Sequence, residues 1–131
     1  MIVIDDTFSY ELKDDYIHFF LKGEQNYEIS VSWWNDIASI ASRLKYKKVL
    51  VETSIFGKLS SLEVLEVVNE FEQIGLKGIK IAYLEANLDQ KSLNEYGSMI
   101  AKLSDIDANV FVDKEEALTW LKYRTPKRAV H

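Results

Sequence analysis

Apolar and polar residues alternate through the first part of the chain, and this pattern constrains the fold more than any other. The alternation runs over residues 8–12 and again over 17–21, and it predicts two β-strands. Asp14 and Asp15 lie between them. A polar link this short predicts an antiparallel hairpin, because a crossover to a parallel strand needs a dozen or more residues.

Beyond the hairpin, helical periodicity alternates with short β-branched runs. In the first helical stretch, Trp33 falls on the apolar face and Trp34 at its margin, so we expect Trp33 to be buried and Trp34 to lie at the rim. Ser60 with Glu63, and Asp113 with Glu116, have the spacing of helix-capping pairs. We expect helices at about 29–44, from Ser60 to near Gly75, around 93–103 and from Asp113 to Leu121, with strands at 47–53, 79–84 and 109–112.

This order predicts an α/β fold with a mixed sheet: an N-terminal β-hairpin followed by βα units, covered by about four helices. We assign residues 1–124 to one domain and 125–131 to a short basic tail. The second helix is apolar over most of its circumference, which predicts cover on more than one side. A neighbouring helix would supply that cover, and a second subunit, making a homodimer, is the alternative.

Composition excludes several classes of protein. Sixteen Lys and Arg against twenty-one Asp and Glu give a formal charge of −5, which disfavours nucleic acid and anionic lipid as partners. The chain has no cysteine, so disulfides, thiolate zinc sites and cysteine nucleophiles are ruled out. No apolar run approaches the roughly 18 residues that a membrane span needs. We therefore expect a cytoplasmic protein without stable membrane insertion.

The segment at 110–121 reads Val-Phe-Val-Asp-Lys-Glu-Glu-Ala-Leu-Thr-Trp-Leu, and 49–52 reads Val-Leu-Val-Glu. With the order of elements, these segments resemble the SpoIIAA-like branch of the STAS domains, related to anti-sigma-factor antagonists. The resemblance implies a regulatory domain that docks on a protein partner. In that family a serine at the start of the second helix, in an Asp-Ser-Ser-Gly setting, is phosphorylated to stop docking. The branch also resembles Sec14-type lipid-binding domains, which implies a small apolar ligand as the alternative.

The matching region here is 58–63, Lys-Leu-Ser-Ser-Leu-Glu, which keeps both serines but lacks the Asp and the Gly. A phosphate at a helix N-terminus would be stabilised by free backbone N–H groups. Ser60 is alternatively an N-cap and nothing more. We assign partner docking or phosphorylation to Ser54, Lys58, Ser60 and Ser61.

Polar residues also follow the predicted strands, at the edge where open parallel sheets bind ligands. These ligand-facing candidates are Glu52, Glu85, Asn87 and Asp113. Converging carboxylates could hold Mg²⁺, but residues at strand ends more commonly begin loops and cap helices. We predict no metal and no cofactor.

Two further patterns are weighed as alternatives. Asp5 and Asp6, with Glu52 and Lys114, are placed roughly as in a response-regulator receiver domain, although a hairpin stands where the first helix of that domain should be. The second pattern is a set of large aromatic residues, Phe20, Tyr27, Trp33, Trp34 and Trp120. They would form a binding patch if one face of the sheet were uncovered. Packing in the core is the simpler interpretation.

Catalytic signals are weak throughout the sequence. His18 stands alone on a predicted strand, and His131 is the last residue. The five glycines match neither a dinucleotide-binding fingerprint nor a P-loop. We predict a binding or regulatory module rather than an enzyme, with no catalytic residue to name.

Overall fold

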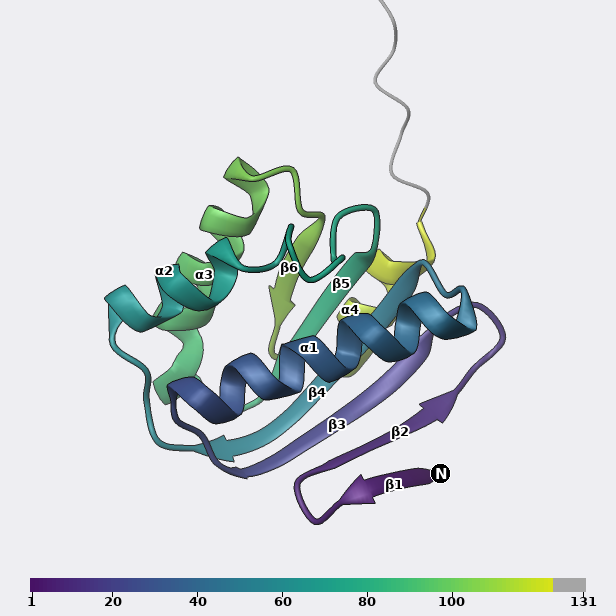
Figure 1. The fold of residues 1–131 in the computed structure, drawn as a ribbon, viewed down its shortest axis with the longest axis horizontal. Coiled ribbons are helices and arrows are strands. Elements are labelled where there is room, and N and C mark those ends of the chain that lie inside the picture. Colours follow the sequence, from purple (N-terminus) through teal and green to yellow (C-terminus); the bar gives the residue numbers. More distant parts are fainter. Residues whose placement is uncertain (124–131) are drawn as a thin grey trace, which may run out of the picture.

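The computed structural model describes residues 1–123, which form one six-stranded sheet with helices on both faces (Figure 1). The predicted basic tail, 125–131, lies outside the described residues. In chain order the elements are β1 (Ile2–Asp5), β2 (Phe8–Leu12), β3 (Ile17–Glu24), α1 (Tyr27–Leu44), β4 (Lys48–Phe56), α2 (Ser61–Asn69), β5 (Lys80–Glu85), the 3₁₀ turn η1 (Leu88–Gln90), α3 (Lys91–Leu103), β6 (Ala108–Phe111) and α4 (Lys114–Lys122).

The strands stand in the sheet in the order in which they occur in the chain. β2 pairs antiparallel with both β1 and β3, whereas β3 to β6 pair in parallel. Each parallel step is made by a helical crossover, as the alternation of strands and helices requires. The predicted α/β class, hairpin and mixed sheet are therefore confirmed.

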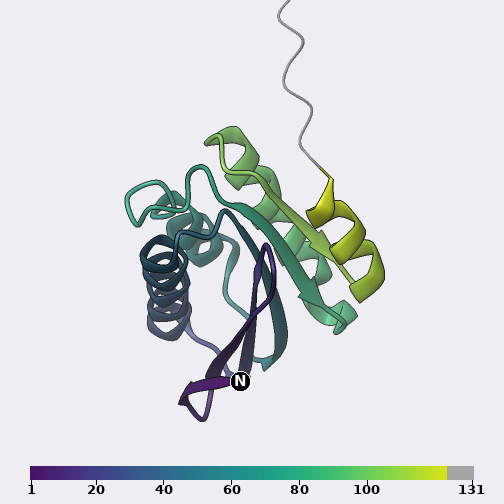
Figure 2. The same ribbon diagram turned by 90° about the vertical axis from the view of Figure 1, so that its right-hand side faces the viewer.

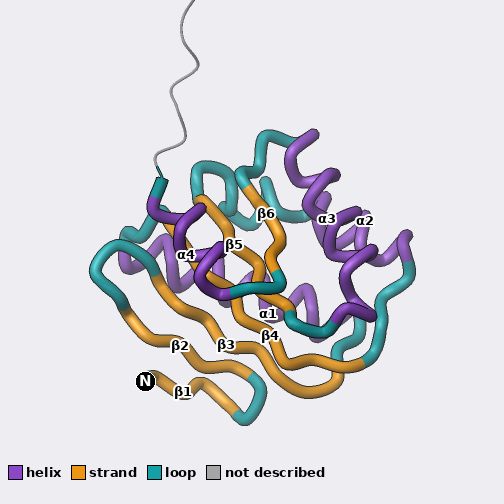
Figure 3. The backbone as a smooth tube through the Cα atoms, turned by 180° about the vertical axis from the view of Figure 1, so that it is seen from behind, coloured by secondary structure: helices purple, strands orange, loops and turns teal. Residues whose placement is uncertain are grey.

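The helices divide unequally between the two faces of the sheet. α1, α2 and α3 cover one face, and α4 packs on β4, β5 and β6 from the other side (Figure 2). From behind, α4 crosses the upper part of the sheet, while no helix lies over β1, β2 and β3 (Figure 3). None of the helices within residues 1–123 is both long and apolar enough to cross a membrane.

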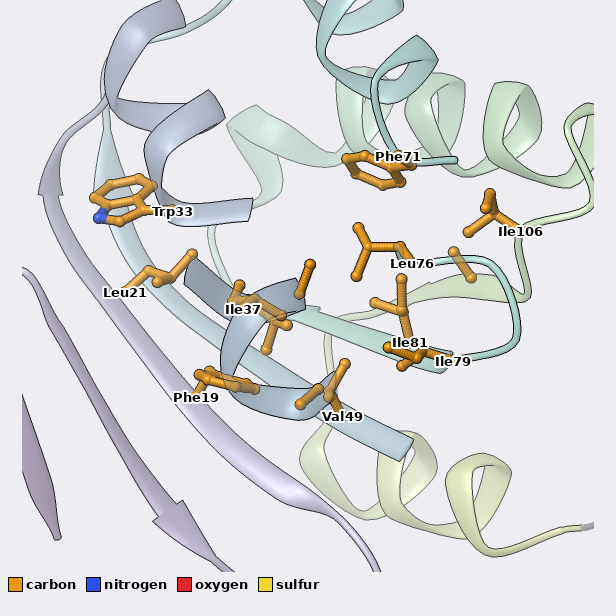
Figure 4. Packing of buried hydrophobic residues seen from close by; sticks show 14 of the residues in the cluster. Phe19, Leu21, Trp33, Ile37, Val49, Phe71, Leu76, Ile79, Ile81 and Ile106 are labelled. Carbon is orange, nitrogen blue, oxygen red and sulfur yellow. The ribbon is translucent and has the colours of Figure 1, made fainter. Parts of the chain in front are cut away.

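The main hydrophobic core lies between the sheet and the three helices of the first face. Alternate residues of β2 and β3 point into it, and Phe8, Phe19 and Ile17 are each at most 2 % exposed. Figure 4 shows Phe19 and Leu21 of β3 beside Ile37 of α1, with Trp33 at the end of the cluster. Trp33 is buried and Trp34 is half-buried, as predicted.

A smaller core under α4 is formed by Leu50, Ala82 and Leu84 of the sheet with Ala117 and Leu121 of the helix. Lys80 joins the two layers, because its Nζ donates to the carbonyls of Trp120 at 2.6 Å and Tyr123 at 2.5 Å. A buried ammonium group at the carboxyl end of a helix is favoured by the helix dipole. This single side chain thus fastens the end of α4 to β5.

α2 is covered by its own chain. It contacts α1 and α3, and Gly97 of α3 lies close against it, since a Cβ on Gly97 would stand 3.2 Å from Val64 and 3.6 Å from Val68. The neighbouring helix expected from the apolar circumference is therefore present, and close packing explains the glycine inside α3. The homodimer suggested as an alternative stays a prediction.

The main differences from the expected elements are one additional strand and two changed ends. The chain begins with a third antiparallel strand, β1, which pairs with β2 at the edge of the sheet. β4 continues to Phe56 instead of ending at Thr53, because its pairing with β3 runs on to Glu24. α2 ends at Asn69 rather than near Gly75, and hydrogen-bonded turns follow it that keep Phe71 and Leu76 buried.

Candidate functional site

The end of β4 and the first turn of α2 present apolar side chains to solvent. Phe56 is 58 % exposed and Leu62 is 62 % exposed, on either side of Lys58, Ser60 and Ser61, which are also exposed. We call residues 54–62 the docking segment. Ser54 belongs to the segment but lies in β4 rather than in a loop. The sequence pointed to the polar residues here, and the structure adds Phe56 and Leu62.

Hydrogen bonds hold the middle of the docking segment in place. Gly57 has φ +84°, a left-handed conformation that favours glycine. Its carbonyl accepts from Gln25 Nε2 at 2.7 Å and from Gln90 Nε2 at 3.0 Å. Ser30 Oγ donates in turn to Gln25 Oε1 at 3.3 Å. The segment is thereby tied to the starts of α1 and α3 and is presented as a shaped surface.

Ser60 is the N-cap of α2, and the predicted capping box is present. Ser60 Oγ accepts from the Glu63 backbone N–H at 3.1 Å, and Glu63 Oε1 accepts from the Ser60 backbone N–H at 2.9 Å. Ser61 is the first residue of the helix, and its side chain is exposed. The hydroxyl of Ser60 thus has a structural role, whereas that of Ser61 has none in the cap.

An apolar hollow of about 100 Å³ lies directly behind the docking segment, between the sheet and α1, α2 and α3. Trp34 forms part of its wall, with ring centroids 4.7 Å from Phe71 and 6.0 Å from Tyr83. Leu59 of the docking segment and Val64 of α2 also line it, and Gln25 and Gln90 are among its polar lining residues. One wall of the hollow is therefore the inner side of the docking segment and α2.

The volume of this hollow limits what it can hold. A dry cavity of about 150 Å³ accommodates benzene, and sites for drug-sized ligands run to roughly 300 Å³ and above. At about 100 Å³ the space fits a small apolar group. A lipid chain would need α2 or α3 to move outwards.

The structure does not gather the four ligand-facing candidates at one site, and only Glu85 and Asn87 are in contact, through the Asn87 backbone N–H. Glu52 and Glu85 point to opposite faces of the sheet, because Glu52 pairs with His18 on the face of α4 while Glu85 follows Tyr83 on the face of α3. Asn87 caps η1 and Asp113 caps α4, both through side-chain oxygens. Within residues 1–123 no three His, Cys, Asp or Glu side chains come together in a way that could hold a metal ion.

His18 is paired, which the sequence did not reveal. Its Nε2 lies 2.8 Å from Glu52 Oε1, and its ring stacks on Phe20 with centroids 4.0 Å apart. Burial lowers the pKa of His18, although Glu52 opposes that change. His18 is only 3 % exposed, whereas the side chain of Glu52 is 37 % exposed, so the imidazole itself lacks the access that a general base needs. Only the register of β3 against β4 could have revealed this pair. In that register Phe20 is the partner of Glu52, and His18 lies two residues before Phe20 on the same face of the sheet.

Glu85 is a carboxylic acid buried at the end of β5 with one oxygen unsatisfied among the described residues. It is 4 % exposed, the Asn87 backbone N–H donates to its carboxylate, and its Oε2 has no hydrogen-bond partner among residues 1–123. Burial raises the pKa of Glu85 to about 7. Burial, together with the charge of Glu85, also raises the pKa of Tyr83. The sequence marked Glu85 as a strand-end carboxylate but gave no sign of its burial.

Comparison with known proteins supports the fold. No protein-family model matches the sequence, and no curated protein matches it. An uncharacterized protein of the DUF3478 family with a SpoIIAA-like fold, from Shewanella loihica PV-4, is similar in structure with a TM-score of 0.55 and 19 % identity, over 88 % of this chain and 92 % of that protein. The anti-sigma factor antagonist SpoIIAA in its unphosphorylated form is similar with a TM-score of 0.52 and 14 % identity, over 90 % of this chain and 100 % of that protein. This chain therefore has the STAS-type, SpoIIAA-like fold.

Proposed function

We propose that this chain is a non-catalytic regulatory module of the cytoplasm that docks on a protein partner through residues 54–62. The observation that carries the proposal is the pair of exposed apolar side chains, Phe56 and Leu62, that flank the start of α2. Fully burying each would contribute about 1.5–3 kcal/mol. The anchoring of Gly57 supports the proposal, because a surface held in place loses little conformational entropy on binding.

The fold comparison supports the same class of function. SpoIIAA is described as an anti-sigma factor antagonist, and the resemblance noted in the sequence implies that in such proteins a serine at the start of the second helix is phosphorylated to stop docking. The net charge of −5 favours a basic partner surface, with Lys58 as a local exception. The same net negative charge disfavours nucleic acid as a partner.

Affinity purification with quantitative mass spectrometry would test the docking segment. A Phe56→Ser/Leu62→Ser variant should weaken retention of the partner at least about tenfold, because two apolar anchors are lost. Leu103→Ser is the matched control, since Leu103 is 81 % exposed at the end of α3, outside the segment. Equal retention of every associated protein by both variants would contradict the proposal, as would the absence of any retained partner.

We propose phosphorylation at Ser60 or Ser61 as the switch of this docking. A phosphate there would meet the positive end of the helix dipole while adding charge to an apolar contact. The informative variant is Ser60→Asn/Ser61→Ala, because Asn caps a helix about as well as Ser. It should stay folded and stop incorporating phosphate in a cell extract of the source organism, while Ser54→Ala serves as control. Unchanged labelling of the double variant would end this part of the proposal.

A second candidate function, binding of a small apolar ligand, is favoured by the hollow behind α2. Native mass spectrometry of the purified protein should then reveal a small bound molecule. Ala101 lines the hollow and is 1 % exposed, so Ala101→Leu should fill the space and abolish the added mass. Protein that is free of ligand, and that gives no change in tryptophan fluorescence with small aromatic probes, would count against this candidate.

A further inference from the structure

The outermost strand of the sheet, β1, carries apolar side chains that are open to solvent (Figure 1). Ile2, Val3 and Ile4 are 43 %, 67 % and 51 % exposed. With Met1 before them they form a consecutive run, whereas the other exposed large apolar residues of 1–123 are isolated in the sequence. Edge strands are commonly blunted by Lys or Pro, and β1 contains neither. An uncovered apolar edge of this kind marks a contact surface.

The opposite edge of the sheet, β6, is protected. The Ile81 N–H donates to the Asp107 carbonyl at 2.8 Å, so the backbone of Val110, an odd number of residues further on, turns away from β5. The Val110 N–H donates to Asn109 Oδ1 at 3.0 Å. A strand added beside β6 would have to displace the Asn109 side chain. Of the two edges of this sheet, β1 is therefore the one that is open to a further strand.

The sequence of β1 is complementary to a second copy of itself. Ile2-Val3-Ile4 reads the same in both directions, so a two-fold axis at Val3 sets Val3 against Val3, and Ile2 against Ile4 of the other copy, in an antiparallel pair. Asp5 and Asp6 follow this stretch. An antiparallel pair keeps the two acidic pairs at opposite ends, each beside the apolar start of the other strand. A parallel pair would bring four carboxylates together, which is unfavourable.

We propose that two copies of this chain associate by antiparallel pairing of their β1 strands about a two-fold axis at Val3. The pair joins the two sheets into one, provides partners for backbone N–H and C=O groups at both edges, and removes apolar side chains of both copies from water. The strand has four residues and a bulge between Val3 and Asp5. Such a small contact gives weak association that depends on protein concentration.

This surface is distinct from those already described. Two strands, β2 and β3, separate β1 from β4, so the docking segment of each copy stays free in the pair. The apolar circumference of α2 takes no part in it. The inference therefore goes beyond the docking function, and neither depends on the other.

Sedimentation velocity at protein concentrations between about 10 µM and 1 mM tests the association, since weak interfaces dissociate in this range. The wild type should pass from monomer towards dimer. Val3→Lys should weaken self-association at least about tenfold, because two like charges would face each other at the two-fold axis and an apolar contact is lost. Leu103→Lys is the matched control, because Leu103 is exposed at the end of α3, and it should associate as the wild type does. Circular dichroism should show both variants folded.

Single cysteines test the pairing register, because the chain has no cysteine of its own. Under mild oxidation Val3→Cys should form a disulfide-linked dimer, since Cβ atoms directly opposite lie about 4.5–5.5 Å apart. A mixture of Ile2→Cys and Ile4→Cys should also cross-link. Either variant alone should do so more slowly, since diagonal neighbours lie about 7–8 Å apart. Leu103→Cys measures the rate of random collision.

A protein that remains monomeric over this concentration range would overturn the inference. A dimer that persists in Val3→Lys, or that Leu103→Lys weakens equally, would do the same, because the contact would then lie elsewhere on the molecule. Cross-linking that is no faster at position 3 than at position 103 would rule out the two-fold axis at Val3.

Discussion

Two buried titratable side chains, Glu85 and His18, lie on opposite faces of the sheet and differ in their hydrogen-bond partners. Burial lowers the pKa of His18, whose ring has a partner in Glu52. Glu85 is buried with one oxygen unpartnered among the described residues. Burial disfavours the charged form of both groups. It therefore raises the pKa of the Glu85 carboxyl and lowers the pKa of the His18 imidazole. At the scale of the residue, the ionised form of Glu85 is destabilised by the fold, because burial removes water from its carboxylate and no side chain or backbone group of the described residues replaces that water at Oε2.

Replacing Glu85 by Gln should therefore stabilise the protein at alkaline pH. The rise in the pKa of Glu85 from 4.5 to about 7 corresponds to a loss of up to about 3 kcal/mol of folding free energy above pH 7, since each pKa unit is worth about 1.36 kcal/mol. Urea unfolding followed by tryptophan fluorescence should show this gain at pH 8. The gain should vanish at pH 4, where Glu85 is protonated both in the folded and in the unfolded chain. A Glu85→Gln protein less stable than wild type at pH 8 would contradict the prediction.

Single residues were predictable wherever local pattern determines their role. The burial of Trp33 and the cap at Ser60 both follow from helical periodicity and propensity. The pairing of His18 with Glu52 depends on the register between β3 and β4, which periodicity does not encode. The unpartnered oxygen of Glu85 depends on which helices cover the end of β5, and this too is a tertiary property.

At the scale of the element, the start of α2 combines a helix cap with the docking segment. The cap is formed reciprocally by Ser60 and Glu63, while the outer side of the first turn is free for a partner. A change at Ser60 should therefore alter stability, whereas a change at Ser61 should not.

We expect Ser60→Ala to cost about 1 kcal/mol of stability, because one orphan N–H of α2 loses its acceptor. Ser61→Ala, one residue on, should change stability by less than about 0.5 kcal/mol, since its side chain is exposed. Ser60→Asn should restore most of the loss. Thermal unfolding of the three variants under one condition would measure this order, and equal losses for Ser60→Ala and Ser61→Ala would show that the cap is unimportant.

The last helix depends on one buried lysine. Lys80→Met keeps the apolar stem but removes the two hydrogen bonds to the carbonyls of Trp120 and Tyr123, and bonds to a charged donor contribute about 1.5–3 kcal/mol each. Amide hydrogen exchange should accelerate in residues 114–122 more than in α1. Exchange that is unchanged in α4, or accelerated equally in α1, would contradict this anchoring role.

Elements were predictable in kind and order but less so at their ends. β1 was missed because three apolar residues alone do not show alternation, and the strand is recognised only by its pairing with β2. β4 runs on because β3 continues beside it, and α2 stops early although its apolar pattern continues into the turns. For β1 and β4, hydrogen bonding to a neighbouring strand decides where the element lies and ends, whereas α2 gives way to turns closed by local hydrogen bonds.

At the scale of the whole molecule, two of the buried ionisable groups, Glu85 and His18, lie on opposite faces of the sheet and have opposing effects on stability. Between about pH 4.5 and 7 the folded state holds the proton of Glu85 more tightly than the unfolded chain does, so stability falls as pH rises. Below about pH 6.5 the folded state holds the proton of His18 less tightly, so stability rises with pH. Over the interval they share, the two contributions should partly cancel.

Removing either group should expose the effect of the other. Against wild type, Glu85→Gln should make stability rise more steeply from pH 5 to 6.5, because only the His18 contribution remains. His18→Phe should tilt the profile the opposite way, towards greater stability at low pH, since Phe fills the buried site next to Phe20 without binding a proton. Urea unfolding of wild type and both variants across this interval measures the slopes, and all other titrating groups are common to the three proteins. Parallel profiles for the three proteins would show that neither side chain changes its proton affinity on folding, and the pairing of opposed buried groups would have to be abandoned.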